Sequence, residues 1–90
     1  MTVPSRREVR KWLSDLAAGE VTREEAADVA RPWIGDRERE VSDPTLWTPL
    51  ARLASADLED AQSHYLYDVW DFTEWLADFE MKSEFDAPPT

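Results

Sequence analysis

Apolar residues recur at helical spacing in four segments of the chain, and residues that cap helices precede them. Ser5 and Glu8 have the spacing of a capping box, in which hydroxyl and carboxylate bond to free amides at a helix start. Behind them one face carries apolar residues at intervals of three and four: Val9, Trp12, Leu13, Leu16 and Ala17. Gly19 suits a left-handed cap. The pattern predicts a first helix between Ser5 and Gly19.

A second capping box follows at once, formed by Thr22 and Glu25. The apolar face of this second predicted helix consists of Ala26, Val29, Ala30, Trp33 and Ile34. Pro32 lacks an amide hydrogen and crowds the preceding turn, so we expect a kink or an early end there. Gly35 closes the segment.

The third helix has two candidate starts. Residues 36–42 alternate in charge without periodicity and are typical of a loop, after which Asp43 and Pro44 suit a cap and a first helical position. Pro49 would instead favour a start at Thr48, after a separate turn. The apolar face on either interpretation is Leu46, Trp47, Leu50, Leu53 and Ala54.

The fourth helix follows a mostly polar stretch, residues 55–64, and a short piece over residues 65–67 that could be extended. Asp68 can cap this helix, with Asp71 in its first turn. Its predicted buried face is Val69, Phe72, Leu76 and Phe79, with Trp75 at the border. Residues 83–90, with two prolines near the end, are expected to fray.

These segments predict an all-α fold, a small antiparallel bundle of three to four helices within one domain over residues 1–90. Trp12, Trp33, Trp47 and Trp75 lie on or beside apolar faces and are expected in the core. The chain has no cysteine, no secretory signal pattern and no apolar run long enough to cross a bilayer. The expected protein is therefore soluble and cytoplasmic.

Charge is distributed unevenly along the chain. Its formal net charge is −10. Residues 1–40 hold eight cations and nine acids, whereas residues 41–90 hold two cations and eleven acids. A strongly acidic chain disfavours nucleic acid and anionic membranes as partners, because both reward clustered Lys and Arg. The composition instead predicts a basic protein partner.

Residues 57–86, within the acidic half, contain seven of the ten aromatic residues, which suggests a candidate docking face. We expect partner-binding residues at Asp57, Glu59, Asp60, Tyr65, Tyr67, Asp68, Trp70, Asp71, Glu74 and Asp78. A solvated surface that serves solubility is an equally weighted alternative for the acids, as core packing is for the three rings. A cluster of four cations, Arg6, Arg7, Arg10 and Lys11, could pair with the acidic last helix and occupy part of this face.

No pattern of catalytic residues is complete. His64 is the only histidine, and Asp68 stands four residues on, but the chain lacks a cysteine nucleophile and a glycine-rich phosphate loop. The ligand pattern of a calcium loop is also missing. We therefore expect a protein that is not an enzyme and needs no cofactor or metal.

The segment WLSDLAAGEVTREEAADVA, a helix joined by a small turn to a Thr-capped second helix, resembles the opening of colicin D-type immunity proteins. This resemblance implies a helical bundle that masks the basic active site of a bacterial nuclease toxin. The leading hypothesis is therefore an immunity-type inhibitor that binds through its acidic, aromatic-rich face. The alternative is a non-catalytic helical module that docks on another protein or forms a homodimer.

Overall fold

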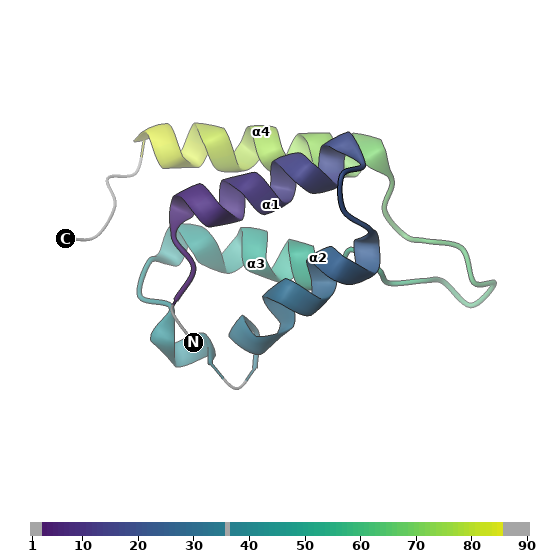
Figure 1. Ribbon diagram of the computed structural model, residues 1–90, viewed down its shortest axis with the longest axis horizontal. Helices are drawn as coiled ribbons and strands as arrows, with labels where there is room; N and C mark the ends of the chain where they lie inside the picture. Colours follow the sequence, from purple (N-terminus) through teal and green to yellow (C-terminus); the bar gives the residue numbers. More distant parts are fainter. Residues whose placement is uncertain (1–2, 36, 86–90) are drawn as a thin grey trace.

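The computed structural model describes residues 3–35 and 37–85, and within them the chain forms four α-helices and no strand. Helices α1 (Arg6–Ala18) and α4 (Val69–Phe85) lie antiparallel along each other, while α2 (Arg23–Ala30) and α3 (Trp47–Ala54) pack beneath them (Figure 1). Three short 3-10 turns connect α2 to α3: η1 (Arg31–Trp33), η2 (Glu38–Glu40) and η3 (Pro44–Leu46). The predicted small antiparallel helical bundle is confirmed.

Both predicted capping boxes are present. The Ser5 hydroxyl accepts a hydrogen bond from the Glu8 amide at 3.1 Å, and the Ser5 amide donates to the Glu8 carboxylate. Thr22 and Glu25 exchange the same pair of bonds at 3.0 Å. Gly19 ends α1 with φ +76°, the left-handed conformation in which glycine carries no steric penalty. The sequence therefore predicts both helix starts correctly.

The core lies between the two helix pairs. Its buried apolar side chains come from every α-helix and from the turns that join them: Val9, Leu13, Leu16, Ala26, Ala30, Trp33, Val41, Leu46, Leu50, Leu53, Ala56, Phe72, Trp75 and Phe79. Trp75 is buried rather than at the border, because the rings of Tyr67 and Phe72 pack against it at centroid distances of 5.0 and 5.2 Å.

Four residues expected on buried faces are exposed instead. Pro32 does end α2 early, and the tighter 3-10 turn that follows keeps Trp33 inward while Ile34 turns outward. Val29 borders an open hollow with Trp12 and Trp33. Val69, the first residue of α4, borders a second hollow beside the turn that joins α1 to α2.

Trp47 is the fourth exposed residue, and the prediction that it lies in the core is wrong. Asp43 caps η3 by accepting from the Thr45 amide at 3.1 Å, so this turn begins at Pro44, and α3 then begins at Trp47 rather than at Thr48. This geometry buries Leu46 and leaves Trp47 half exposed, with its indole nitrogen donating to the Val41 carbonyl oxygen at 2.9 Å.

A hairpin-like loop precedes α4 and projects beyond the helices at the end where α1 finishes (Figure 1). One β-bridge joins Glu59 to Tyr65, so the extended piece expected at residues 65–67 does not form a strand. The Arg23 guanidinium fixes the base of the loop: it lies 4.2 Å from the Tyr65 ring centroid and donates to the Tyr67 carbonyl oxygen at 2.9 Å.

The last helix is longer than expected. Asp68 caps its start by accepting from the Trp70 and Asp71 amides at 2.9 and 3.3 Å, as predicted. The helix continues to Phe85, so residues 83–85 are helical where fraying was expected. The remaining residues of that expected tail, 86–90, lie outside the described part of the chain.

Candidate nucleic-acid interface

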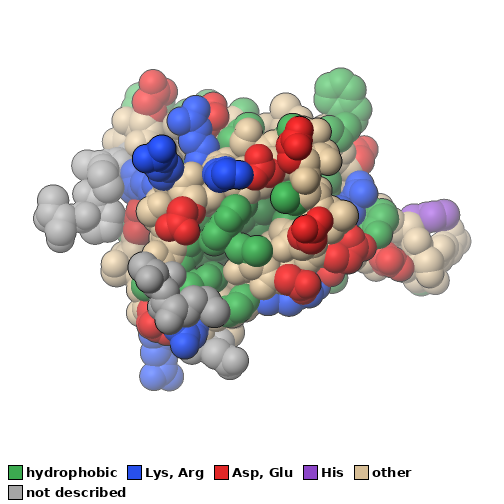
Figure 2. Space-filling view, viewed as in Figure 1, with side chains coloured by type: hydrophobic (Ala, Val, Ile, Leu, Met, Phe, Trp, Pro, Cys, Tyr) green, Lys and Arg blue, Asp and Glu red, His purple; other side chains and the backbone are tan. Residues whose placement is uncertain are grey.

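The first half of α1 carries four of the ten cations of the chain, Arg6, Arg7, Arg10 and Lys11. Val9 and Leu13 turn the opposite side of this helix into the core, with no exposed surface. The helical repeat therefore leaves Arg7, Arg10 and Lys11 at the outer surface of one short stretch, whereas Arg6 lies nearer the core. Figure 2 shows Lys and Arg side chains gathered at the end of the molecule where α1 starts.

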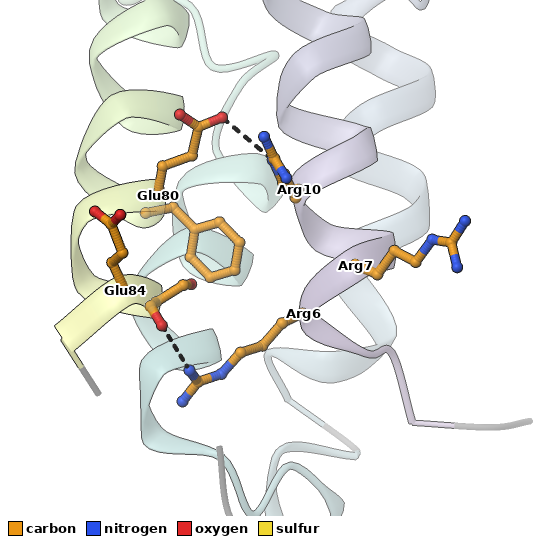
Figure 3. Close-up of a pocket in the computed structure, with 7 residues that line it drawn as sticks. Arg6, Arg7, Arg10, Glu80 and Glu84 are labelled. Atoms are coloured by element: carbon orange, nitrogen blue, oxygen red, sulfur yellow. Dashed lines mark hydrogen bonds and ion pairs between the residues drawn. The ribbon is translucent and has the colours of Figure 1, made fainter. Parts of the chain in front are cut away.

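An open groove of about 460 Å³ separates this stretch from the end of α4. Cations line its α1 side, and Glu80, Ser83 and Glu84 line its α4 side with the edge of the buried Phe79 ring (Figure 3). The groove forms because α1 and α4 run antiparallel, which brings the start of one helix beside the end of the other.

Arg6 is an internal structural residue. Its Nε and Nη2 donate to the Asp43 carboxylate at 2.6 and 3.0 Å, and its Nη1 donates to the Ser83 carbonyl oxygen at 3.5 Å. The two charged side chains are only 16% and 12% exposed. The Arg6 guanidinium holds the pKa of Asp43 below its usual value, although burial alone would raise it. Arg6 thereby ties α1 to η3 and α4.

Arg10 and Lys11 make pairs that water can reach. Arg10 Nε donates to Glu80 Oε1 across the groove at 3.2 Å, and Lys11 Nζ donates to Asp15 Oδ2 within α1 at 2.6 Å. Exposed pairs of this kind contribute only about 0–1 kcal/mol, and each uses only one of the N–H donors of its cation. Both cations are therefore available to a ligand.

Arg7 differs from its neighbours. It is exposed and makes no hydrogen bond or ion pair with any part of the chain that the structure describes. Figure 3 shows its side chain pointing away from the groove and from α4. The start of α1 thus presents one free guanidinium next to two cations in weak pairs.

The ten residues of the predicted docking face do not form one free surface. Asp57 binds Arg31, and Asp78 accepts from Arg52 at 2.8 Å and lies 3.5 Å from Lys82. The Arg52 guanidinium, with a further contribution from Lys82, lowers the pKa of Asp78. The predicted pairing of the four cations with the last helix occurs only in part. Arg10 pairs with Glu80 and Arg6 reaches the Ser83 carbonyl oxygen, whereas Lys11 pairs within its own helix.

Several of the other acids stabilise local turns. Asp60 accepts from the Gln62 and His64 amides inside the loop, at 2.8 and 3.0 Å. Asp71 accepts from the Asp68 amide, while Asp68 caps α4. Glu59 and Glu74 are exposed, with no side-chain hydrogen bond or ion pair among the described residues.

The three candidate rings have three different environments. Tyr65 donates from its hydroxyl to Glu24 at 2.8 Å; this bond raises the pKa of Tyr65 and lowers that of Glu24. Tyr67 is half-buried against Trp75. Only Trp70 projects freely, with 78% of its surface exposed.

His64 lies in the projecting loop, and its Nδ1 is 3.8 Å from an Asp60 oxygen. Over residues 3–35 and 37–85, no three His, Cys, Asp or Glu side chains come together in a way that could hold a metal ion. No helix of the described chain is both long and apolar enough to cross a membrane.

The family comparison decides how the cationic end of α1 is interpreted. The model of the family described as "YxzC DNA-binding protein" matches residues 4–79. The chain belongs to this family. The curated "Uncharacterized protein YxzC" of Bacillus subtilis (strain 168) is 33% identical over 67 residues, which cover 74% of this chain and 55% of that relative. The chain thus spans about half the length of that relative. No solved structure matches the chain.

Membership of the YxzC DNA-binding protein family corrects three expectations. The resemblance to colicin D-type immunity proteins is wrong, because the YxzC match includes the segment on which it was based. The hypothesis of an immunity-type inhibitor, or of a module that only docks on proteins, is overturned with it. So is the exclusion of nucleic acid as a partner. That exclusion used the net charge of the whole chain, whereas a phosphate backbone interacts with the charges nearest to it.

The sequence pattern shows the cations at the start of the first helix, but it leaves open whether they pair with the acidic last helix. The signal that separates Arg7 from Arg6 is not local. It depends on Asp43, which lies 37 residues further along the chain and becomes the partner of Arg6 only when η3 packs against α1.

Proposed function

We propose that this chain is a non-enzymatic DNA-binding protein that contacts the phosphate backbone with the exposed side chains of Arg7 and Lys11, on either side of Arg10. The name of its family supports DNA as the ligand. The observation that carries the choice of surface is the environment of Arg7, which is exposed, without a partner in the described chain, and flanked by two weakly paired cations.

A DNA phosphate can bind these cations with little loss of the interactions that they make within the chain. A guanidinium or ammonium group forms shorter, stronger hydrogen bonds with an anionic oxygen than neutral groups do. The Lys11 ammonium group is exposed, and its pair with the half-buried Asp15 contributes little to stability. Positive charge held on a helix also releases counterions from DNA, which is the main source of nonspecific affinity.

The acidic remainder of the molecule restricts how DNA can approach. The projecting loop carries Glu59 and Asp60, and the outer side of α4 carries Glu74. These carboxylates repel phosphate, whereas the start of α1 attracts it. DNA therefore meets the molecule at the end away from the loop (Figure 1).

A second arrangement, in which α2 enters the DNA, fits the charges poorly. The turn over residues 19–22 joins α1 to α2 in the manner of a helix-turn-helix, whose second helix usually enters the major groove. Here α2 presents Glu24, Glu25 and Asp28 as exposed side chains. Three outward carboxylates on an eight-residue helix would face the phosphates, which favours α1 as the DNA-contacting element.

The test is a fluorescence anisotropy titration of a labelled DNA duplex at several salt concentrations. Arg7→Gln and Lys11→Gln each remove one phosphate contact, so each should weaken binding several-fold. Each should also reduce the slope of log affinity against log salt by about one. Circular dichroism should confirm that both variants keep the helical content of the wild-type chain.

Gln62→Glu provides the matched control. It changes the net charge by the same one unit, but it lies in the projecting loop, far from the start of α1. Its affinity and salt slope should remain close to those of the wild-type chain. Equal losses in all three variants would show that only net charge matters and would contradict the proposed surface.

Two further expectations from the sequence, that the protein is not an enzyme and that it is cytoplasmic, remain proposals. A DNA-binding role requires no chemical step, in keeping with the absence of a complete catalytic pattern in the sequence. A chain that binds chromosomal DNA would work in the bacterial cytoplasm.

A further inference from the structure

The side chains of Arg10 and Glu80 form a hydrogen bond that crosses the groove. The bond joins Arg10 Nε to Glu80 Oε1 at 3.2 Å (Figure 3). A guanidinium has five N–H donors in a planar fork. Glu80 takes the one on Nε, so the four on the two Nη atoms remain free to bind a ligand.

We propose that Arg10 reads guanine in the major groove of DNA, and that Glu80 is the positioning residue that directs its guanidinium. This inference rests on the proposed function, because it assigns a base contact to the same surface. The two terminal Nη groups of an arginine match O6 and N7 of guanine, the most common specific contact between proteins and DNA.

The contrast with Arg7 supports a base contact for Arg10 rather than another phosphate contact. A phosphate accepts hydrogen bonds from many directions, so an unrestrained side chain such as Arg7 can serve it. A base edge requires a fork of fixed direction, and a carboxylate on a neighbouring helix fixes that direction. Arg10 is also 65% exposed and Glu80 45%, so a base edge can reach the free end of the fork.

The groove also explains why an acidic residue can belong to a DNA-binding surface. Glu80 adds repulsion toward phosphate, which lowers affinity for every sequence equally. If Glu80 orients Arg10, it lowers the affinity for every sequence but raises the preference for guanine. A variant that neutralises Glu80 should therefore bind more tightly and prefer guanine less, and the two quantities can be measured separately.

The experiment compares two duplexes of equal length and sequence, one with guanine and one with 7-deazaguanine, which lacks the N7 acceptor but keeps base pairing and charge. The wild-type chain should bind the guanine duplex about fivefold more tightly. Arg10→Ala removes the fork, so the ratio should fall to one. Arg7→Ala, the matched control, removes the same charge and should weaken binding to both duplexes but keep the ratio.

Glu80→Gln tests the positioning role. Removal of its charge should tighten binding to both duplexes, yet the preference for guanine should fall because a neutral amide oxygen holds the fork more weakly than a carboxylate does. Glu84→Gln removes the same charge from the same groove, at a residue with no partner in the described chain. It should tighten binding and leave the preference unchanged.

Two results would overturn the inference while DNA binding itself stands: equal affinity of the wild-type chain for the two duplexes, or a preference that Glu80→Gln and Glu84→Gln leave equally intact. Failure to bind either duplex would instead overturn the proposed function, and the inference with it.

Discussion

Arg6 and Arg7 are neighbours in the sequence, yet their side chains have opposite roles. Successive residues on a helix point about a quarter-turn apart, so one arginine faces η3 and α4 while the next faces solvent. Arg6 is held by Asp43 and the Ser83 carbonyl oxygen, whereas Arg7 has no partner in the described chain. One stabilises the fold, and the other is available to the DNA ligand that we propose.

The Arg6–Asp43 pair should make a measurable contribution to stability. Asp43→Ala removes a largely buried carboxylate, the cap of η3 and the charge that pairs with Arg6. We expect the free energy of unfolding in urea to fall by about 3 kcal/mol. Glu74→Gln, at an exposed residue of α4, should change it by less than about 0.5 kcal/mol. Similar values for the two variants would contradict a structural role for the pair.

The same pair predicts a dependence on pH. Because Arg6 lowers the pKa of Asp43 in the folded state, its stabilising contribution is fully present above the unfolded value of about 3.9 and is lost as pH falls through the folded pKa. Asp43→Asn keeps an oxygen for the cap but cannot titrate. Its stability should therefore decline less steeply in acid than that of the wild-type chain, and parallel acid limbs would contradict this assignment.

Among the helices, the boundaries that local chemistry determines are the ones that sequence predicts. The capping boxes of α1 and α2, the left-handed Gly19 and the Asp68 cap of α4 each involve residues within a few positions. Buried faces are harder to predict, because periodicity shows which side of a helix is apolar but not how much of that side the neighbouring elements cover. Trp47 and Val69 turned outward because each begins its helix at a junction that tertiary packing determines.

The two glycines offer a test at the level of these elements. A Cβ atom at Gly19 or Gly35 would meet nothing within 4 Å, so steric contact distinguishes neither. Gly19 alone has a positive φ, so Gly19→Ala should cost about 1–2 kcal/mol in thermal or urea unfolding. Gly35→Ala should be neutral or stabilise by up to about 1 kcal/mol through the unfolded chain. Equal destabilisation by both would contradict the left-handed cap.

For the molecule as a whole, the net charge describes the composition correctly, but it led to the wrong exclusion of nucleic acid as a partner. The chain has a net charge of −10, but four of its cations lie together at the start of α1. Glu59 and Asp60 lie on the projecting loop, and Glu74 lies on the outer side of α4. Sequence alone located the four cations. It could not show which of them remain available, because Asp43 and Glu80 are distant in sequence and reach them only in the folded chain.

The central claim is that DNA binds at the start of α1, and amide NMR spectra of the isotope-labelled chain, titrated with a DNA duplex at low salt, test it most directly. The account predicts that the amides of residues 6–14 and of residues 80–84 shift, while those of residues 58–66 in the projecting loop stay in place. Shifts confined to the loop and the start of α4, with α1 unchanged, would contradict it.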